Sequence, residues 1–237
     1  MLKINEFSFK YPNGYVAVDN LTLHVESGDL YAFIGHNGAG KTTTIKSIVG
    51  ILEFEDGEIL VNGKSVLEDS YSTKQQIAYL PDNPDLYDSL TGIQYLNFIS
   101  DIYRLSKDDR QKQIEFYAKE FEMLDKLGNY ISSYSHGMKQ KLALIGAFIH
   151  KPKLLILDEP FVGLDPKASF VVKKMMKEFC EQGGAIFFST HILEVAQKLC
   201  NKMAIIKKGK LIKEGLMEEI TKDTSLEDVF LELTENV

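Results

Sequence analysis

The sequence contains little cysteine, no long apolar run and no excess of positive charge. Its two cysteines, Cys180 and Cys200, fall in predicted helices and lack the spacing of metal ligands. We therefore expect both to be buried, reduced thiols of a cytosolic protein. No apolar segment approaches the roughly 18–20 residues that a membrane-spanning helix requires. Any action at a membrane is then expected to depend on another polypeptide.

Two further absences narrow the class of protein. The first residues, MLKINEFSFK, alternate like a β-strand and lack the apolar centre of a signal peptide. The formal net charge of −7, from 27 Lys and Arg against 34 Asp and Glu, argues against nucleic acid or an anionic membrane surface as the main partner. With 44% hydrophobic and 26% charged residues, the composition is typical of a globular protein.

The most informative stretch is GHNGAGKTT, from Gly35 to Thr43, which matches the phosphate-binding pattern G-x-x-x-x-G-K-[ST]. It lies between an apolar run predicted as a buried strand, 30–34, and a predicted helix, 44–52. Glycines let successive backbone N–H groups point at the phosphates, and the helix directs its positive dipole end at the same anion. A chance glycine loop is the alternative, and the flanking strand and helix argue against it.

These features predict a site for a nucleoside triphosphate and a magnesium ion. Lys41 is expected to reach the β- and γ-phosphates, and the Thr42 hydroxyl is expected to bind Mg²⁺. The candidate phosphate-binding residues are Gly35, Asn37, Gly38, Ala39, Gly40, Lys41, Thr42 and Thr43.

The order of predicted elements indicates an α/β fold with a P-loop nucleotide-binding core and a mostly parallel sheet. Two alternating runs, 2–9 and 18–25, predict an antiparallel β subdomain at the N-terminus. After a strand at 77–80 the periodicity becomes helical, which predicts an inserted α-helical subdomain. Its predicted helices lie near 92–103, 108–127 and 137–150, with Gly128 as the stop of the second.

We expect one domain over residues 1–237. It divides into a nucleotide-binding core (1–85 and 149–222), the inserted helical subdomain (86–148) and a C-terminal helix (223–237). The last of these is predicted because the apolar residues of the tail recur at helical spacing after a serine suited to begin a helix.

Two carboxylates follow the predicted buried strand 153–157. Asp158 and Glu159 stand at its C-terminal end, where ligands bind in parallel sheets. Asp158 is a candidate Mg²⁺ ligand. Because neighbouring strand residues point in opposite directions, Glu159 has a separate role and is the candidate general base. His191 ends the next predicted strand and is expected to reach the γ-phosphate region. The alternatives are a solvated acidic strand end and a structural histidine.

The segment Tyr134-Ser-His-Gly-Met-Lys-Gln140 resembles the signature sequence of ATP-binding-cassette (ABC) ATPases. Other segments resemble further motifs of that family in the family's order: Tyr11 its adenine-stacking aromatic, the segment before Pro84 its Q-loop, Gly163-Leu164-Asp165 its D-loop, and His191 its switch histidine. From the residues alone, Tyr11 is either a platform for a nucleobase or a structural turn tyrosine. The resemblance covers essentially the whole chain.

The resemblance implies the ATP-hydrolysing subunit of a membrane transporter, with ATP and Mg²⁺ as cofactors. Ser135, His136 and Gly137, at the start of a predicted helix, would cap the ATP held by a second cassette. A dimer is therefore implied, and we expect a homodimer. A separate integral membrane permease is the implied partner, which would hold the chain at the cytoplasmic face of the membrane. No nucleic acid is expected as a partner.

The chain departs from the family's pattern at two places. In the signature, Tyr134, His136 and Met138 replace the leucine, the first glycine and the glutamine of L-S-G-G-Q, whereas Gly137 is kept. This variant resembles cassettes paired with exporter-type permeases, which implies export. At the Q-loop position, Asp82 replaces glutamine. Asp82 either modulates coupling to the permease or only caps the turn that follows it.

A soluble ABC ATPase, acting in cofactor assembly or on nucleic acid or ribosomes, is the alternative function. DNA-repair members of the family insert long coiled coils and translation members carry two cassettes, and residues 1–237 contain neither pattern. Assembly ATPases for iron–sulfur clusters stay open. A small-molecule P-loop kinase would leave the signature and His191 unexplained.

Overall fold

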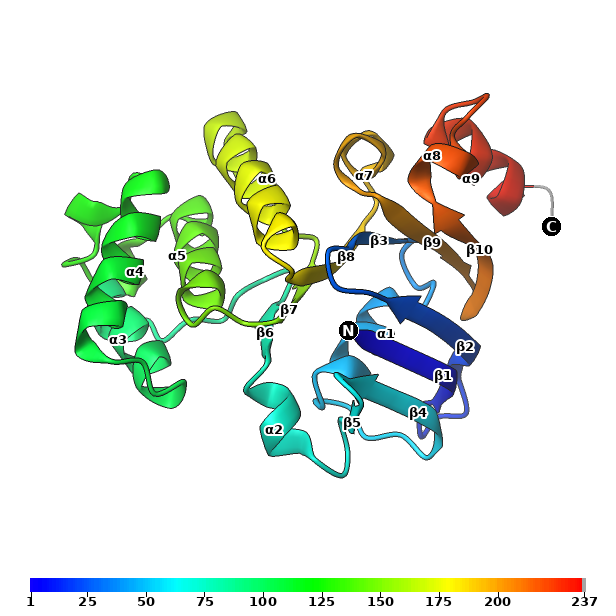
Figure 1. Ribbon diagram of the computed structural model, residues 1–237, viewed down its shortest axis with the longest axis horizontal. Helices are drawn as coiled ribbons and strands as arrows, with labels where there is room; N and C mark the ends of the chain where they lie inside the picture. Colours follow the sequence, from blue (N-terminus) through cyan, green and yellow to red (C-terminus); the bar gives the residue numbers. More distant parts are fainter. Residues whose placement is uncertain (236–237) are drawn as a thin grey trace.

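Two β-sheets organise residues 1–235, the part of the chain that the computed structural model describes (Figure 1). The larger sheet has six strands in the order β10-β9-β3-β8-β7-β6, and the smaller has four in the order β2-β1-β4-β5. The larger sheet contains β3 (Leu30–Ile34), β6 (Ile77–Leu80), β7 (Leu154–Asp158), β8 (Ala185–Thr190), β9 (Lys202–Lys207) and β10 (Lys210–Leu216). The smaller contains β1 (Leu2–Lys10), β2 (Val16–Val25), β4 (Asp56–Val61) and β5 (Lys64–Ser65).

The pairing of these strands confirms the predicted fold class. In the larger sheet, β9, β3, β8, β7 and β6 run parallel and only the edge strand β10 is antiparallel to its neighbour. The smaller sheet is antiparallel and comes from the N-terminal part of the chain.

The register of the parallel strands brings the predicted chemistry to one edge of the larger sheet. β3 pairs with β8 so that Ile34 lies opposite Thr190, and β8 pairs with β7 so that Ser189 lies opposite Asp158. Because parallel strands end at the same edge, the segments that follow β3, β7 and β8 emerge side by side. These segments are the phosphate loop, Glu159 and His191.

Helices cover both faces of the larger sheet and form a separate layer at one end (Figure 1). They are α1 (Lys41–Ile48), α2 (Ser70–Lys74), α3 (Gly92–Ile102), α4 (Lys107–Glu120), α5 (His136–Ile149), α6 (Pro166–Glu181), α7 (Leu193–Leu199), α8 (Met217–Ile220) and α9 (Leu226–Glu235). In Figure 1, α6 and α7 lie on one side of the larger sheet, and α1 lies with the smaller sheet on the other. The layer of α3, α4 and α5 lies beyond β6.

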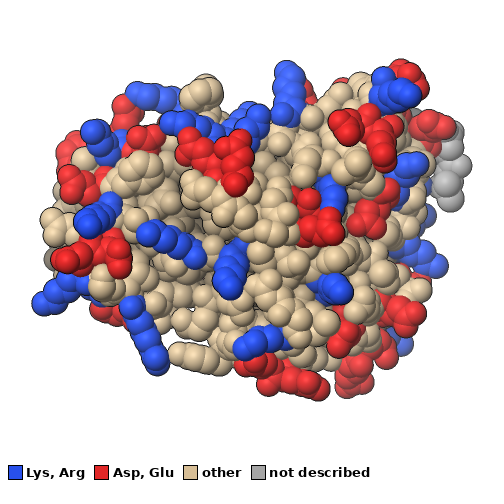
Figure 2. Space-filling view, in the orientation of Figure 1, with Lys and Arg blue, Asp and Glu red and all other residues tan. Residues whose placement is uncertain are grey.

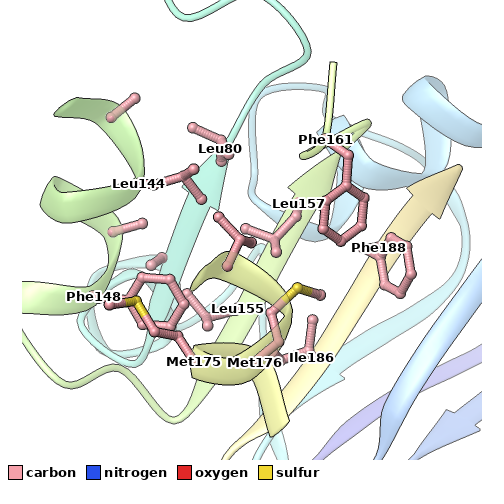
Figure 3. Packing of buried hydrophobic residues seen from close by; sticks show 14 of the residues in the cluster. Leu80, Leu144, Phe148, Leu155, Leu157, Phe161, Met175, Met176, Ile186 and Phe188 are labelled. Carbon is pink, nitrogen blue, oxygen red and sulfur yellow. The ribbon is translucent and has the colours of Figure 1, made fainter. Parts of the chain in front are cut away.

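The central strands divide their buried side chains between two cores. Toward α6 they present Leu155, Leu157, Ile186 and Phe188, which pack with Met175 and Met176 of that helix (Figure 3). Toward the smaller sheet they present Tyr31, Phe33, Ile156 and Phe187. Full burial of one such side chain stabilises the fold by about 1.5–3 kcal/mol relative to exposure. The edge that carries the site is therefore held between two packed layers.

The predicted helix 108–127 is too long, because α4 ends at Glu120. Glu122 adopts a left-handed conformation with φ of 55°, and the Met123 N–H donates to the Ala118 carbonyl at 2.7 Å. This pattern closes a helix as a C-terminal glycine would. The predicted stop at Gly128 is therefore wrong, and two short 3₁₀ helices, 124–126 and 131–133, occupy the segment that follows. Sequence reasoning also missed α2 and α8, which are too short to show a periodic pattern.

Both cysteines are buried and unpaired, as predicted. The Cys180 thiol donates to the Asp29 carbonyl at 3.3 Å. Burial raises the pKa of Cys180 to about 12, and burial likewise raises the pKa of Cys200.

The predicted C-terminal helix is present as α9, which begins at Leu226 and reaches Glu235. Residues 236 and 237 of that predicted segment lie outside the described residues. Within residues 1–235, no helix combines the length and the apolar character needed to cross a membrane.

Candidate functional site

The phosphate loop follows β3 and turns directly into α1. Gly40 stands before the helix with φ of 110°, and no side chain caps the helix N-terminus. A Cβ atom at Gly40 would lie 2.5 Å from the Ala17 carbonyl oxygen, and one at Gly35 would lie 2.5 Å from the Ile206 carbonyl oxygen. Both glycines are therefore required by the close approach of neighbouring backbone. The first N–H groups of α1 remain available to an anion.

Lys41 is held inside this loop. Its ammonium group donates to the carbonyl of Gly35 at 2.6 Å and to that of His36 at 3.3 Å, and the residue is only 7% exposed. Burial lowers the pKa of Lys41, while the carboxylates of Glu159 and Asp158 oppose that shift. The geometry places one buried cation at the centre of the loop, facing the two predicted carboxylates.

Thr42 and Asp158 meet across the sheet edge. The Thr42 hydroxyl donates to Asp158 Oδ2 at 3.0 Å, and the Ser189 hydroxyl donates to Asp158 Oδ1. Hydroxyl and carboxylate oxygens are hard ligands that suit Mg²⁺, which completes its octahedron with water and phosphate oxygens. The pair therefore fits the metal role predicted for it. Ser189, which sequence reasoning did not single out, orients the carboxylate.

Glu159 and His191 also come together, as their positions on neighbouring strands predicted. Glu159 Oε1 lies 2.9 Å from His191 Nδ1; the carboxylate side chain is 13% exposed and the imidazole 58%. Glu159 has a left-handed backbone with φ of 50°, and its N–H donates to the Ser189 carbonyl and hydroxyl at 3.3 and 3.2 Å. Such a conformation is uncommon for a glutamate, and here it is accompanied by these two hydrogen bonds from the Glu159 N–H. The two carboxylates thus have different partners: Asp158 binds the hydroxyls of Thr42 and Ser189, and Glu159 contacts His191.

Tyr11 lies beside the loop, but part of its ring is already covered. Its hydroxyl is 3.1 Å from Thr43 Oγ1, and its ring packs edge-on against Phe9 and face-on against Tyr15, with centroids 4.9 and 6.4 Å away. Tyr15 is 53% exposed and donates to the Gly38 carbonyl at 3.3 Å. Sequence reasoning missed Tyr15, although its place across a tight turn from Tyr11 was a usable signal. A nucleobase on this side of the loop would therefore meet two tyrosines.

The signature residues begin α5 at an exposed helix end. The Ser135 hydroxyl accepts from the Met138 N–H at 3.3 Å and so caps the helix. Ser135 and His136 are exposed, whereas Gly137 is partly buried. A Cβ atom at Gly137 would lie 2.9 Å from the Gly163 carbonyl oxygen, which explains why glycine is kept there.

The signature helix is bound to the D-loop that follows Glu159. The His136 ring fills the space beside Gly163, and Lys141 forms an ion pair with Asp165 at 2.8 Å. Lys141 holds the pKa of Asp165 below its usual range, and Asp165 also caps α6 by accepting from the Ala168 N–H at 2.8 Å. Lys141 lies outside the residues that the sequence had singled out.

Asp82 is exposed in the bend that follows β6. Within the described residues its carboxylate makes no hydrogen bond, so the turn cap that the sequence allowed is not formed. Burial raises the pKa of Tyr79 to about 12, and the negative charges of Asp158 and Asp82 add to this rise. Asp82 therefore lies close enough to Tyr79 for its charge, like that of Asp158, to affect the tyrosine hydroxyl.

Comparison with known proteins is consistent with this geometry. Residues 18–162 match the family model described as ABC transporter. The chain is 36% identical over 239 residues to the ABC-type transporter ATP-binding protein EcsA of Bacillus subtilis (strain 168), an alignment that covers 99% of this chain and 96% of that protein.

Solved structures extend the similarity to three dimensions. A structure described as the ATP binding subunit of an ABC transporter is 34% identical, with a TM-score of 0.95 and coverage of 99% of each chain. CbiO1 from Clostridium perfringens, described as part of the ABC transporter complex cbiONQ, is 26% identical, with a TM-score of 0.80 and coverage of 94% of this chain and 90% of that one. The chain therefore belongs to the ABC transporter family, and it is an ATP-binding ABC ATPase domain.

Proposed function

We propose that two copies of this chain close around two ATP molecules and hydrolyse them. Each ATP would lie between the phosphate loop of one copy and Ser135, His136 and Gly137 of the other. The observation that carries this proposal is that the two candidate anion sites of one chain, the phosphate loop and the signature, belong to separate parts of the fold. The signature begins α5, which packs on α3, α4 and β6, whereas the phosphate loop leads into α1, which packs on β2 and β7.

In this proposal each group at the sheet edge has one task. Lys41 and the N–H groups of α1 hold the phosphates, and Thr42 and Asp158 hold Mg²⁺, which supplies charge neutralisation when bound. Glu159 accepts a proton from the attacking water, and its bond to His191 orients both side chains toward the γ-phosphate region. Tyr11, with Tyr15 beside it, stacks on the adenine. Asp165 positions the D-loop between the copies.

The partner that converts hydrolysis into transport would be a separate membrane permease, and we propose that transport is export. The helical subdomain, residues 86–148 between core segments 1–85 and 149–222, offers an exposed aromatic pair for this contact. Tyr87 and Phe98 are 57% and 41% exposed, and their rings pack edge-on at 5.6 Å. CbiO1 is described as part of a transporter complex, which supports such a partner. The chain would then lie peripherally at the cytoplasmic face of the membrane.

A soluble ABC ATPase is the competing function. On the face shown in Figure 2, basic and acidic side chains are interspersed rather than gathered into a basic field, which disfavours a nucleic-acid partner. Membrane fractionation separates the two functions. The transporter subunit should co-purify with an integral membrane protein, and recovery of the chain only from the soluble fraction, without such a protein, would favour the soluble function.

Ser135→Arg should leave ATP binding by the isolated chain intact while preventing hydrolysis. The arginine side chain would occupy the space into which the partner's γ-phosphate must fit, so the defect acts in the opposite copy. Binding of a fluorescent ATP analogue and release of phosphate measure the two effects separately. Ser133→Arg, at an exposed position in the same segment, is the matched control and should hydrolyse ATP normally. Full hydrolysis by Ser135→Arg would contradict the shared site.

Asp82→Ala should change the affinity for Mg·ATP by no more than a few-fold but reduce the stimulation of hydrolysis by the permease. The carboxylate acts on the sheet edge through its charge and makes no hydrogen bond there, so its removal leaves the loop intact. ATPase assays at increasing Mg²⁺, with and without permease-containing membranes, measure both effects. Asn83→Ala, in the same bend, is the control. Complete loss of nucleotide binding would make Asp82 a primary metal ligand instead of a modulator.

A further inference from the structure

The C-terminal helix α9 reaches the phosphate loop through one aromatic contact. Phe230 is 7% exposed and packs edge-on against the ring of His36, with centroids 4.8 Å apart and planes at 61°. His36 is the second residue of the loop, and its carbonyl accepts from the Lys41 ammonium at 3.3 Å. The His36 side chain is otherwise exposed to solvent. One residue of α9 therefore contacts the segment that positions the phosphate-binding lysine.

The helix is itself anchored to the core. At its start, the Leu226 N–H donates to Gln197 Oε1 of α7 at 3.0 Å, and the Leu226 side chain is fully buried. Near its end, the Lys207 ammonium, from β9, donates to the Thr234 carbonyl at 2.7 Å. The helix contacts α7, and Figure 1 shows it next to α8, at the side of the sheet where β9 and β10 lie. Phe230 therefore projects toward His36 from a support that is fixed at both ends.

We propose that Phe230 is a positioning residue for ATP: it fixes His36 and so pre-forms the loop backbone that receives the phosphates. A loop that is ordered before binding loses less conformational freedom when the ligand arrives, which increases affinity. The carbonyl of Ile206, in β9, also lies close to Gly35, the first residue of the loop. The first two residues of the loop are thus contacted by β9 and by α9. The proposal depends on the assignment of Gly35–Thr43 as the ATP phosphate loop, which Lys41→Ala tests separately.

Phe230→Ala in the full chain should weaken the binding of a fluorescent ATP analogue by about 3- to 10-fold, the range expected from loss of an aromatic pair. The KM for ATP should rise by a similar factor, while kcat at saturating ATP is unchanged because Glu159 and His191 are untouched. Val229→Ala is the matched control, since Val229 is partly buried on the same helix and packs against the same core. It should lower the melting temperature without changing ATP affinity.

A double-mutant cycle decides whether the contact itself is responsible. His36→Ala should weaken ATP binding as much as Phe230→Ala does, and the double variant should lose little more, because both changes remove one interaction. If Phe230→Ala does not fold, Phe230→Leu replaces it in the experiment, because leucine keeps an apolar side chain in α9. Phe230→Leu should show part of the loss in ATP affinity. The proposal would be overturned if the losses of ATP affinity in His36→Ala and Phe230→Ala simply added in the double variant. It would also be overturned if Phe230→Leu, Val229→Ala and the parent bound ATP equally well.

Discussion

Lys41→Ala is expected to abolish tight ATP binding. No other basic side chain is held by the carbonyls of the phosphate loop in the described residues, and Lys41 is already desolvated there. Hydrogen bonds from a buried cation to two phosphates contribute about 3 kcal/mol or more, so the Kd should rise by roughly 100-fold or more. Titration with a fluorescent ATP analogue in the presence of Mg²⁺ measures the change.

The fold should survive this substitution, because the alanine removes a buried charge together with its hydrogen bonds. Lys46→Ala is the matched control: Lys46 lies in the last turn of the same helix, away from the loop, and its replacement should leave ATP affinity unchanged. If Lys41→Ala bound ATP as tightly as the parent, with the same melting temperature, the assignment of the phosphate loop would be wrong.

Glu159→Gln should stop hydrolysis while leaving ATP binding intact. The amide keeps the size of the side chain and its contact with His191, but it no longer offers a negative oxygen to take the proton of the attacking water. General bases contribute about 100- to 10,000-fold to rate, and a decrease in kcat within that range is expected. Because ATP would then persist in the proposed shared site, the closed dimer should accumulate, which gel filtration with Mg·ATP detects.

Glu194→Gln is the control for this experiment. Glu194 lies on α7, close in sequence to His191, but its exposed carboxylate is paired with Lys198 at 2.6 Å, so its loss should leave kcat unchanged. Hydrolysis by Glu159→Gln at the parent rate would assign the base elsewhere. A Glu159→Gln chain that binds ATP yet stays monomeric in the presence of the permease would contradict the shared site.

The phosphate loop and the strand-end residues could be predicted because local pattern and topology agree there. The glycines, the lysine and the flanking strand and helix fix the loop, and parallel strands must end at one edge. That rule, together with the order of the strands, predicted that Glu159 and His191 would be neighbours. Glu159 Oε1 lies 2.9 Å from His191 Nδ1.

Contacts between segments far apart in the sequence could not be predicted in this way. Three such contacts join elements whose relative placement depends on packing. They are the ion pair of Lys141 with Asp165, the ring contact of His36 with Phe230, and the hydrogen bond from the Ser189 hydroxyl to Asp158. The end of α4 was missed for a local reason. Glutamate at position 122 takes the left-handed conformation that sequence reasoning assigns to glycine.

The burial of Cys180 and Cys200 has a consequence for redox chemistry. Oxidation and alkylation of cysteine proceed through the exposed thiolate. Both thiols are buried, and the pKa of each lies above its usual range, so the thiolate fraction at neutral pH is very small. The ATPase domain therefore carries no cysteine switch: peroxide or a maleimide reagent finds no reactive native thiol in the folded chain.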